Sequence, residues 1–104
     1  MSTMRIYIAG PMTGYPDYNR DAFEVAAIAL KLHNHEPLNP REHDTPDDAP
    51  WGTHLRVDIA ALLTADAVAV LDDWECSRGA TLEVSIAQAL GMTVKPLDQW
   101  LRDE

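Results

Sequence analysis

Four short runs with the composition of β-strands are spaced along the chain and separated by segments of helical periodicity. They comprise residues 5–9, 36–38, 67–71 and 93–97. The third run, Ala-Val-Ala-Val-Leu, is apolar throughout, which is typical of a central parallel strand covered on both faces. Pro37 in the second run has no N–H to donate to a ladder, so we expect this strand at an edge of the sheet.

Apolar residues at helical spacing predict helices over residues 19–33, 53–64 and 78–90. Asn19 is a candidate N-cap of the first helix, and Gly91 is a favourable residue just past the end of the third. The inward faces of the first two helices should comprise Phe23, Ala26, Ala27, Leu30, Leu55, Ile59, Leu62 and Leu63.

The alternation of strands and helices predicts one α/β domain over residues 1–104. We expect an open parallel sheet of four or five strands, order 2-1-3-4, in a Rossmann- or flavodoxin-like three-layer sandwich. Ligands bind such sheets outside the carboxyl ends of the strands, here where the loops over residues 10–18 and 72–79 emerge. The polar, proline-rich loop over residues 39–52 is long enough to suggest a function, and residues 98–104 form a short tail.

Glu83 falls on the wrong side of its predicted helix. At about 100° per residue it lies roughly 200° from Thr81 and Ser85, which belong to the polar stripe. An inward glutamate is costly unless something uses or satisfies it. The alternative interpretation is a glutamate favoured by the positive end of the helix dipole. The face that Glu83 shares should be the apolar one, with Ala80, Ala87 and Leu90.

Asp58 is a second inward carboxylate, and the alternative for it is a salt bridge with Arg56 or Arg78. Two carboxylates at one crevice fit glycosidic chemistry, because one can attack or stabilise an anomeric carbon while the other protonates the leaving group. Ser77, just before the third helix, is either an N-cap or a hydroxyl that points into the crevice.

Composition and charge narrow the class of ligand. The net charge of −9 argues against non-specific binding to nucleic acid or to an anionic membrane. It does not exclude a small phosphorylated ligand, because helix N-termini and backbone amides can hold a phosphate. The single cysteine, Cys76, excludes an internal disulfide. The sequence has no recognisable signal segment and no apolar run long enough to cross a bilayer, so we expect a soluble, cytoplasmic protein.

Other motif-like features carry little chemistry. The loop Gly10-Pro11-Met12-Thr13-Gly14 has neither dinucleotide nor P-loop spacing; its glycines either let backbone amides approach a ligand or serve a turn. The four histidines, His33, His35, His43 and His54, match no zinc spacing, so we expect no metal and no cofactor. Trp51 and Trp74 either pack their loops against the core or stack on a base.

Residues 5–14, Arg-Ile-Tyr-Ile-Ala-Gly-Pro-Met-Thr-Gly, resemble the start of the nucleoside 2-deoxyribosyltransferase-like proteins. Asp58, the segment 65–68 and the pattern Ser77-x-Gly-Ala-x-x-Glu83-x-x-x-Ala-x-x-x-Gly91 resemble the remainder of their signature. The chain is most similar to the short, often phage- or prophage-borne DUF4406 branch, and it also resembles the deoxynucleoside 5′-monophosphate N-glycosidases.

This resemblance implies roles for particular residues. Glu83 would attack C1′ of the sugar, Asp58 would contact or protonate the base, and Tyr7 would orient Glu83. The substrate would be bound by the loop Gly10, Pro11, Met12, Thr13 and Gly14 and by Ser77, Arg78 and Gly79. Pro11 and Thr13 stand where the glycosidases carry a phosphate-binding serine and arginine, which leaves Arg20, Arg78 and backbone amides as substitutes. Relatives of this type are generally dimers or larger, so the resemblance also implies a homodimer or a larger homo-oligomer.

Three functions follow as hypotheses. The first is cleavage or transfer at the N-glycosidic bond of a (deoxy)nucleoside or its 5′-monophosphate. The second is a non-catalytic nucleotide-binding or sensor module of phage origin, although a pure binder has no need of a nucleophilic glutamate. The third is an interaction domain, for which Trp100, Leu101 and parts of the second helix offer candidate apolar surface.

Overall fold

The computed structural model describes residues 3–43, 45–46 and 48–102. Its centre is a four-stranded sheet with the order β2-β1-β3-β4, and each pair of neighbouring strands is parallel. The predicted α/β class and strand order are therefore confirmed, with β2 at an edge. The strands are β1 (Arg5–Ala9), β2 (Glu36–Leu38), β3 (Ala67–Val70) and β4 (Thr93–Pro96).

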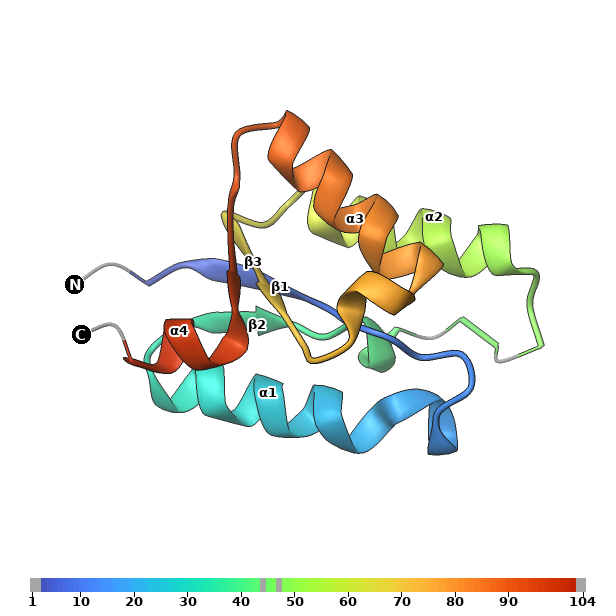
Figure 1. Ribbon diagram of the computed structural model, residues 1–104, viewed down its shortest axis with the longest axis horizontal. Helices are drawn as coiled ribbons and strands as arrows, with labels where there is room; N and C mark the ends of the chain where they lie inside the picture. Colours follow the sequence, from blue (N-terminus) through green and yellow to red (C-terminus); the bar gives the residue numbers. More distant parts are fainter. Residues whose placement is uncertain (1–2, 44, 47, 103–104) are drawn as a thin grey trace.

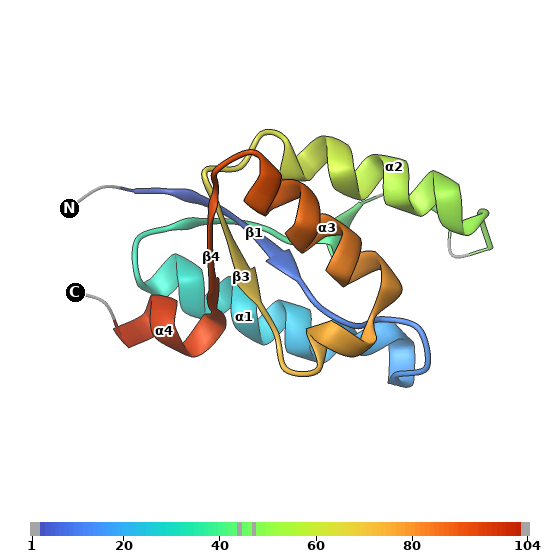
Figure 2. The ribbon, with the colours of Figure 1, turned by 45° about the horizontal axis from the view of Figure 1, so that its top comes forward.

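Helices cover both faces of the sheet and complete the predicted three-layer sandwich. Figures 1 and 2 show α1 and α4 on one side of the sheet and α2 and α3 on the other. Each side forms its own buried cluster of apolar side chains. The helices are α1 (Arg20–Leu32), α2 (Trp51–Leu62), α3 (Arg78–Ala89) and α4 (Leu97–Arg102).

The alternation of side chains along β1 decides which residues reach the α2–α3 side. Ile6 and Ile8 pack with α1 and α4, whereas Tyr7 and Ala9 pack with α2 and α3. All four side chains are buried. Tyr7 therefore enters the same layer as α3, and this placement brings its hydroxyl within reach of that helix.

The C-terminal segment differs from the predicted tail, because Leu97–Arg102 forms helix α4. Trp100 is only 5% exposed, and its Nε1 donates a hydrogen bond of 3.0 Å to the carbonyl oxygen of Val68 in β3. Burying an indole with its N–H satisfied holds the segment on the sheet. The expectation of an apolar surface at Trp100 was therefore wrong.

Three other local predictions also fail at the ends of helices. Asn19 has a left-handed backbone (φ 64°) and makes no capping bond; its Nδ2 donates instead to the carbonyl of Pro11 at 2.9 Å. Leu63 and Leu90, predicted to face inward, are 59% and 58% exposed. Both leucines follow the last helical residue, where helical periodicity no longer fixes the direction of a side chain. Gly91 has a φ of 78°, which agrees with its predicted place after α3.

Gly10 is required by packing directly after β1. A Cβ at this position would lie 2.9 Å from Cβ and Cδ1 of Leu71. We therefore expect Gly10→Ala to lower the free energy of unfolding by about 1–3 kcal/mol, as overpacked core positions do. Urea denaturation measures this change. Gly52→Ala is the matched control, because a Cβ there meets no atom within 4 Å; an equal loss of stability in both variants would contradict the steric explanation.

No helix among the described residues is long and apolar enough to cross a membrane.

Candidate active site

A cavity of about 670 Å³ opens where β1 ends and α3 begins. Its walls come from the loop after β1, the loop between β2 and α2, helix α2 and the start of α3. This is the switch point of the sheet, where ligands of open α/β folds bind. The cavity is lined by nine of the eleven residues predicted to be catalytic or to bind substrate: Gly10, Pro11, Met12, Thr13, Asp58, Ser77, Arg78, Gly79 and Glu83.

Glu83 lies on the buried wall of this cavity. It is 6% exposed, and its Oε2 accepts a hydrogen bond of 3.1 Å from the hydroxyl of Tyr7. Tyr7 does not line the cavity but lies beneath it, fully buried in the sheet. Glu83 is the sixth residue of α3, beyond the first turn, so the helix dipole does not account for its burial.

The surroundings of Glu83 favour its neutral form. Burial raises the pKa of Glu83 from its ordinary 4.5 to about 8, and the nearby charge of Asp58 adds to the increase, while the Tyr7 hydrogen bond opposes it. Burial, followed by the charges of Glu83 and Asp58, also raises the pKa of Tyr7 well above its ordinary value. Tyr7 is thus a neutral donor that favours an ionised Glu83.

Asp58 projects from α2 into the cavity and contacts His43. Its Oδ1 lies 3.1 Å from Nδ1 of His43, and the two side chains are 15% and 23% exposed. Burial raises the pKa of Asp58, while His43, and to a smaller extent His54 and Arg41, act in the opposite direction. Among the described residues the partner of Asp58 is therefore His43, and not Arg56 or Arg78, which the alternative interpretation offered.

The start of α3 presents a helix N-terminus to the cavity. Ser77 caps the helix, because its Oγ accepts a hydrogen bond of 3.1 Å from the backbone N–H of Ala80, so the capping interpretation is confirmed. The hydroxyl keeps its own hydrogen to donate to a ligand. The space beside Gly79 is open, because a Cβ added at this residue would meet no atom within 4 Å. The residues at this N-terminus line the cavity, where the positive end of the helix dipole favours an anion.

The first loop contributes four of its five predicted residues. Gly14 does not line the cavity, and its φ of 88° fits the interpretation of a turn glycine. The hydroxyl of Tyr15 donates a 3.2 Å hydrogen bond to Oδ2 of Asp73, which joins this loop to the loop after β3. Two wall segments of the cavity are thus tied to each other.

The cavity is rich in cations for an acidic protein. Three of the chain's eight lysine and arginine residues, Arg20, Arg41 and Arg78, line it. The guanidinium of Arg78 lies 4.3 Å from the ring centroid of Trp51, and that of Arg41 lies 5.6 Å from the ring of Tyr18. Both stacking contacts orient an arginine and leave its charge in place.

Sequence reasoning missed the part of the site that comes from the loop before α2. His43 was weighed there only as a metal ligand, and Arg41 was not singled out, although the unusual length of this loop was a signal. Residues 3–43, 45–46 and 48–102 contain no group of three or more His, Cys, Asp and Glu side chains placed to hold a metal ion.

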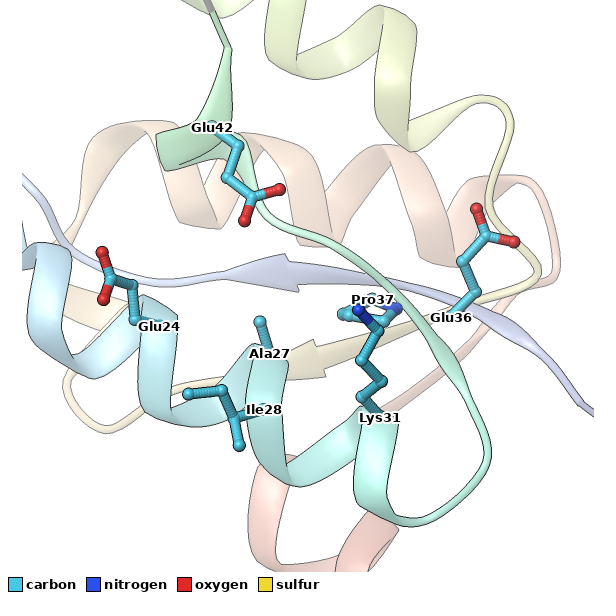
Figure 3. Close-up of a pocket in the computed structure, with 7 residues that line it drawn as sticks. All are labelled: Glu24, Ala27, Ile28, Lys31, Glu36, Pro37 and Glu42. Atoms are coloured by element: carbon cyan, nitrogen blue, oxygen red, sulfur yellow. The ribbon is translucent and has the colours of Figure 1, made fainter.

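A second, smaller hollow of about 330 Å³ lies away from this site, between α1 and the edge strand β2. Figure 3 shows Glu24, Glu36 and Glu42 around it, with Lys31 rising from α1. Neither of the buried carboxylates, Glu83 and Asp58, belongs to its lining. The candidate catalytic residues therefore belong to the larger cavity.

Two solved structures share this fold. A 2-deoxyribosyltransferase from Bacillus psychrosaccharolyticus superimposes with a TM-score of 0.68 at 20% identity, over 86% of this chain and 69% of that chain. A 2-deoxyribosyltransferase from Leishmania mexicana gives 0.66 at 23% identity, over 86% of this chain and 61% of that chain. The chain thus spans roughly two thirds of their length and has the fold of the nucleoside 2-deoxyribosyltransferase-like proteins.

The family itself is shown by sequence. Residues 4–96 match the family described as "Domain of unknown function (DUF4406)", and the chain belongs to this family. Among curated proteins, no sequence matches it significantly. The predicted membership of the DUF4406 family is therefore confirmed, and the two solved structures show that the likeness to the 2-deoxyribosyltransferases holds for the fold.

Proposed function

We propose that this protein cleaves or transfers at the N-glycosidic bond of a (deoxy)nucleoside or its 5′-monophosphate, with Glu83 as the nucleophile. The observation that carries the proposal is the buried Glu83 carboxyl group on the cavity wall, held by Tyr7 beside a second carboxylate, Asp58. The shared fold with two 2-deoxyribosyltransferases supports the same class of reaction.

The reaction has two steps. In the first, ionised Glu83 forms a bond to C1′ of the sugar, and the C1′–N bond breaks with its electron pair passing to the base, which takes a proton from Asp58. In the second, water or another base attacks C1′ and loses a proton to Asp58, while the bond to Glu83 breaks and its carboxylate is restored. Water gives hydrolysis, and a second base gives transfer.

The positive charge around the cavity supports a phosphorylated substrate over the free nucleoside. Arg41, Arg78 and the N-terminus of α3 line the cavity, in a chain whose net charge is −9. Arg20 lines it as well, with its Nε paired to Oδ2 of Asp17 at 2.9 Å. Such a concentration of positive charge attracts an anionic group. We therefore propose a (deoxy)nucleoside 5′-monophosphate as the preferred substrate, with the phosphate near α3 and the base toward Asp58.

Chromatographic detection of free base tests the proposal. The protein is incubated with matched sets of deoxynucleosides and deoxynucleoside 5′-monophosphates, with and without a second free base. We expect base release to be faster from the monophosphates, and exchange with the added base wherever transfer competes with water. Binding by calorimetry without release of base from any member of either set would contradict catalysis and favour the nucleotide-binding module.

Self-association into a homodimer or larger assembly, and a cytoplasmic location, stay predictions. Sedimentation of the full chain measures the first.

A further inference from the structure

The loop between β2 and α2 places one imidazole against Asp58. His43 follows a short 3₁₀ turn, Pro40–Glu42, whose start is fixed because Oδ1 of Asn39 accepts a hydrogen bond of 2.9 Å from the N–H of Arg41. Asn39 is 4% exposed, so this turn is anchored in the protein. Both His43 and Asp58 line the cavity, and their side chains are mostly buried.

Nδ1 of His43 and Oδ1 of Asp58 share one proton in a hydrogen bond. At 3.1 Å, either Nδ1 of His43 donates to an ionised carboxylate or a protonated carboxyl donates to Nδ1. Within the described part of the chain, Oδ2 of Asp58 makes no hydrogen bond, and since Asp58 lines the cavity this oxygen can act on a ligand there. The arrangement therefore separates an oxygen held by the protein from one that can act on substrate.

Resting on the proposed function, we propose that His43 is a positioning residue for Asp58. Its Nδ1–H holds Oδ1 and stabilises the ionised carboxylate that is left when Asp58 has given a proton to the departing base. Asp58 must then take a proton from the attacking water, and a carboxylate that is kept ionised serves as that base. His43 thus acts mainly on the second step, in which the bond between C1′ and Glu83 breaks.

The surroundings of Asp58 make this role specific to His43. Burial raises the pKa of Asp58, and of the neighbouring groups it is His43 that opposes this most strongly, through both an electrostatic interaction and its hydrogen bond. Burial disfavours the ionised form of Asp58, and the charge of that form in turn raises the pKa of Glu83 on the facing helix. The titratable and charged groups that face Asp58 are Arg41 and His43 from the loop, His54 from α2, Tyr7 from β1 and Glu83 from α3.

Two variants at His43 separate the hydrogen bond from the rest of the side chain. His43→Asn places an amide N–H close to the position of Nδ1, whereas His43→Leu removes both the donor and the charge. His33→Asn is the matched control, because His33 is exposed at the end of α1 and contacts the carbonyl of Ala29 at 2.9 Å. Each protein is studied by NMR titration of the Asp58 carboxyl carbon and by the time course of base release.

We expect His43→Leu to raise the pKa of Asp58 by about one unit or more, and His43→Asn by less. In His43→Leu the first base per site should still be released quickly, with later turnovers slowed about 10²-fold, which is the size of a lost general base. The result is an initial burst of about one base per site, smaller in His43→Asn and unchanged from wild type in His33→Asn.

The Asp58 titration and the time course of base release test the two proposals separately. An Asp58 titration that is identical in wild type and both His43 variants overturns the proposal whether or not base is released. A shifted titration with the first and later turnovers slowed equally overturns the role in the second step and leaves His43 a structural residue. Absence of base release from the wild type overturns the proposed function, while the titration still decides whether His43 controls the proton on Asp58.

Discussion

Glu83→Gln should reduce the rate of base release at least about 10³-fold. The amide keeps the size of the side chain and can still accept the hydrogen bond from Tyr7, but it cannot form the bond to C1′ that the proposed first step requires. Chromatography of the released base measures the loss. Because the cavity wall is unchanged, binding of the nucleotide should fall far less than the rate.

Two controls limit this prediction to the carboxylate. Glu24→Gln removes a glutamate on the exposed side of α1 and should leave the rate unchanged. In the wild type, kcat/KM should follow a bell-shaped pH profile, because the first step needs Glu83 ionised, with a pKa of about 8, and Asp58 protonated. Retention of more than a tenth of the wild-type rate by Glu83→Gln would remove Glu83 from the reaction.

The same substitution should stabilise the protein at high pH. The pKa of Glu83 is raised on folding from 4.5 to about 8, so the folded chain binds the proton more tightly than the unfolded chain. The stability that this proton confers is complete below pH 4.5 and is lost as the pH rises through 8. At about 1.36 kcal/mol per pKa unit, the loss above pH 8 is on the order of several kcal/mol.

Glutamine resembles the protonated acid and does not ionise, so Glu83→Gln should not suffer this loss. We expect nearly equal thermal unfolding temperatures for variant and wild type at pH 4.5, and a difference in favour of the variant that grows up to about pH 8. Calorimetry across this range measures the difference. Glu24→Gln should parallel the wild type, and a Glu83→Gln curve that also parallels it would show that the Glu83 carboxylate is not desolvated.

Together these two expectations give Glu83 the character of a functional residue. A side chain that lowers the stability of the fold and is nevertheless needed for turnover is explained by function and not by stability. In the nucleotide-binding alternative, Glu83→Gln would still stabilise the fold but would change no rate. The pair of experiments therefore distinguishes a catalytic site from a binding site on the same scaffold.

Local patterns in the sequence predicted the elements of the fold well. The run Ala67–Val70 is apolar on both faces, and only a covered central strand satisfies such a segment. Phe23, Ala26 and Leu30 repeat at helical spacing and are buried on α1. The inward direction of Glu83 followed from its angle around α3 relative to Ala80 and Ala87, because a helix fixes these angles by its own geometry.

The predictions that failed depended on contacts beyond one element. Helix α4 is held on the sheet by the hydrogen bond from Trp100 to a carbonyl oxygen of β3. Short-range periodicity cannot indicate such a contact. Leu63 and Leu90 extended a helical pattern past the point where the helix ends. Asn19 has the residue type of an N-cap, but its side-chain amide donates a hydrogen bond to the carbonyl oxygen of Pro11 in the preceding loop.

By itself the sequence determined the order of strands and helices and the inward placement of a glutamate and an aspartate, since both follow from periodicities of two and 3.6 residues. Only the tertiary structure decided what those carboxylates meet. The register of β1 beside β3 puts Tyr7 under Glu83, and the anchored turn after β2 puts His43 against Asp58. These partners lie 76 and 15 residues apart in the chain, and packing of separate elements brings them together.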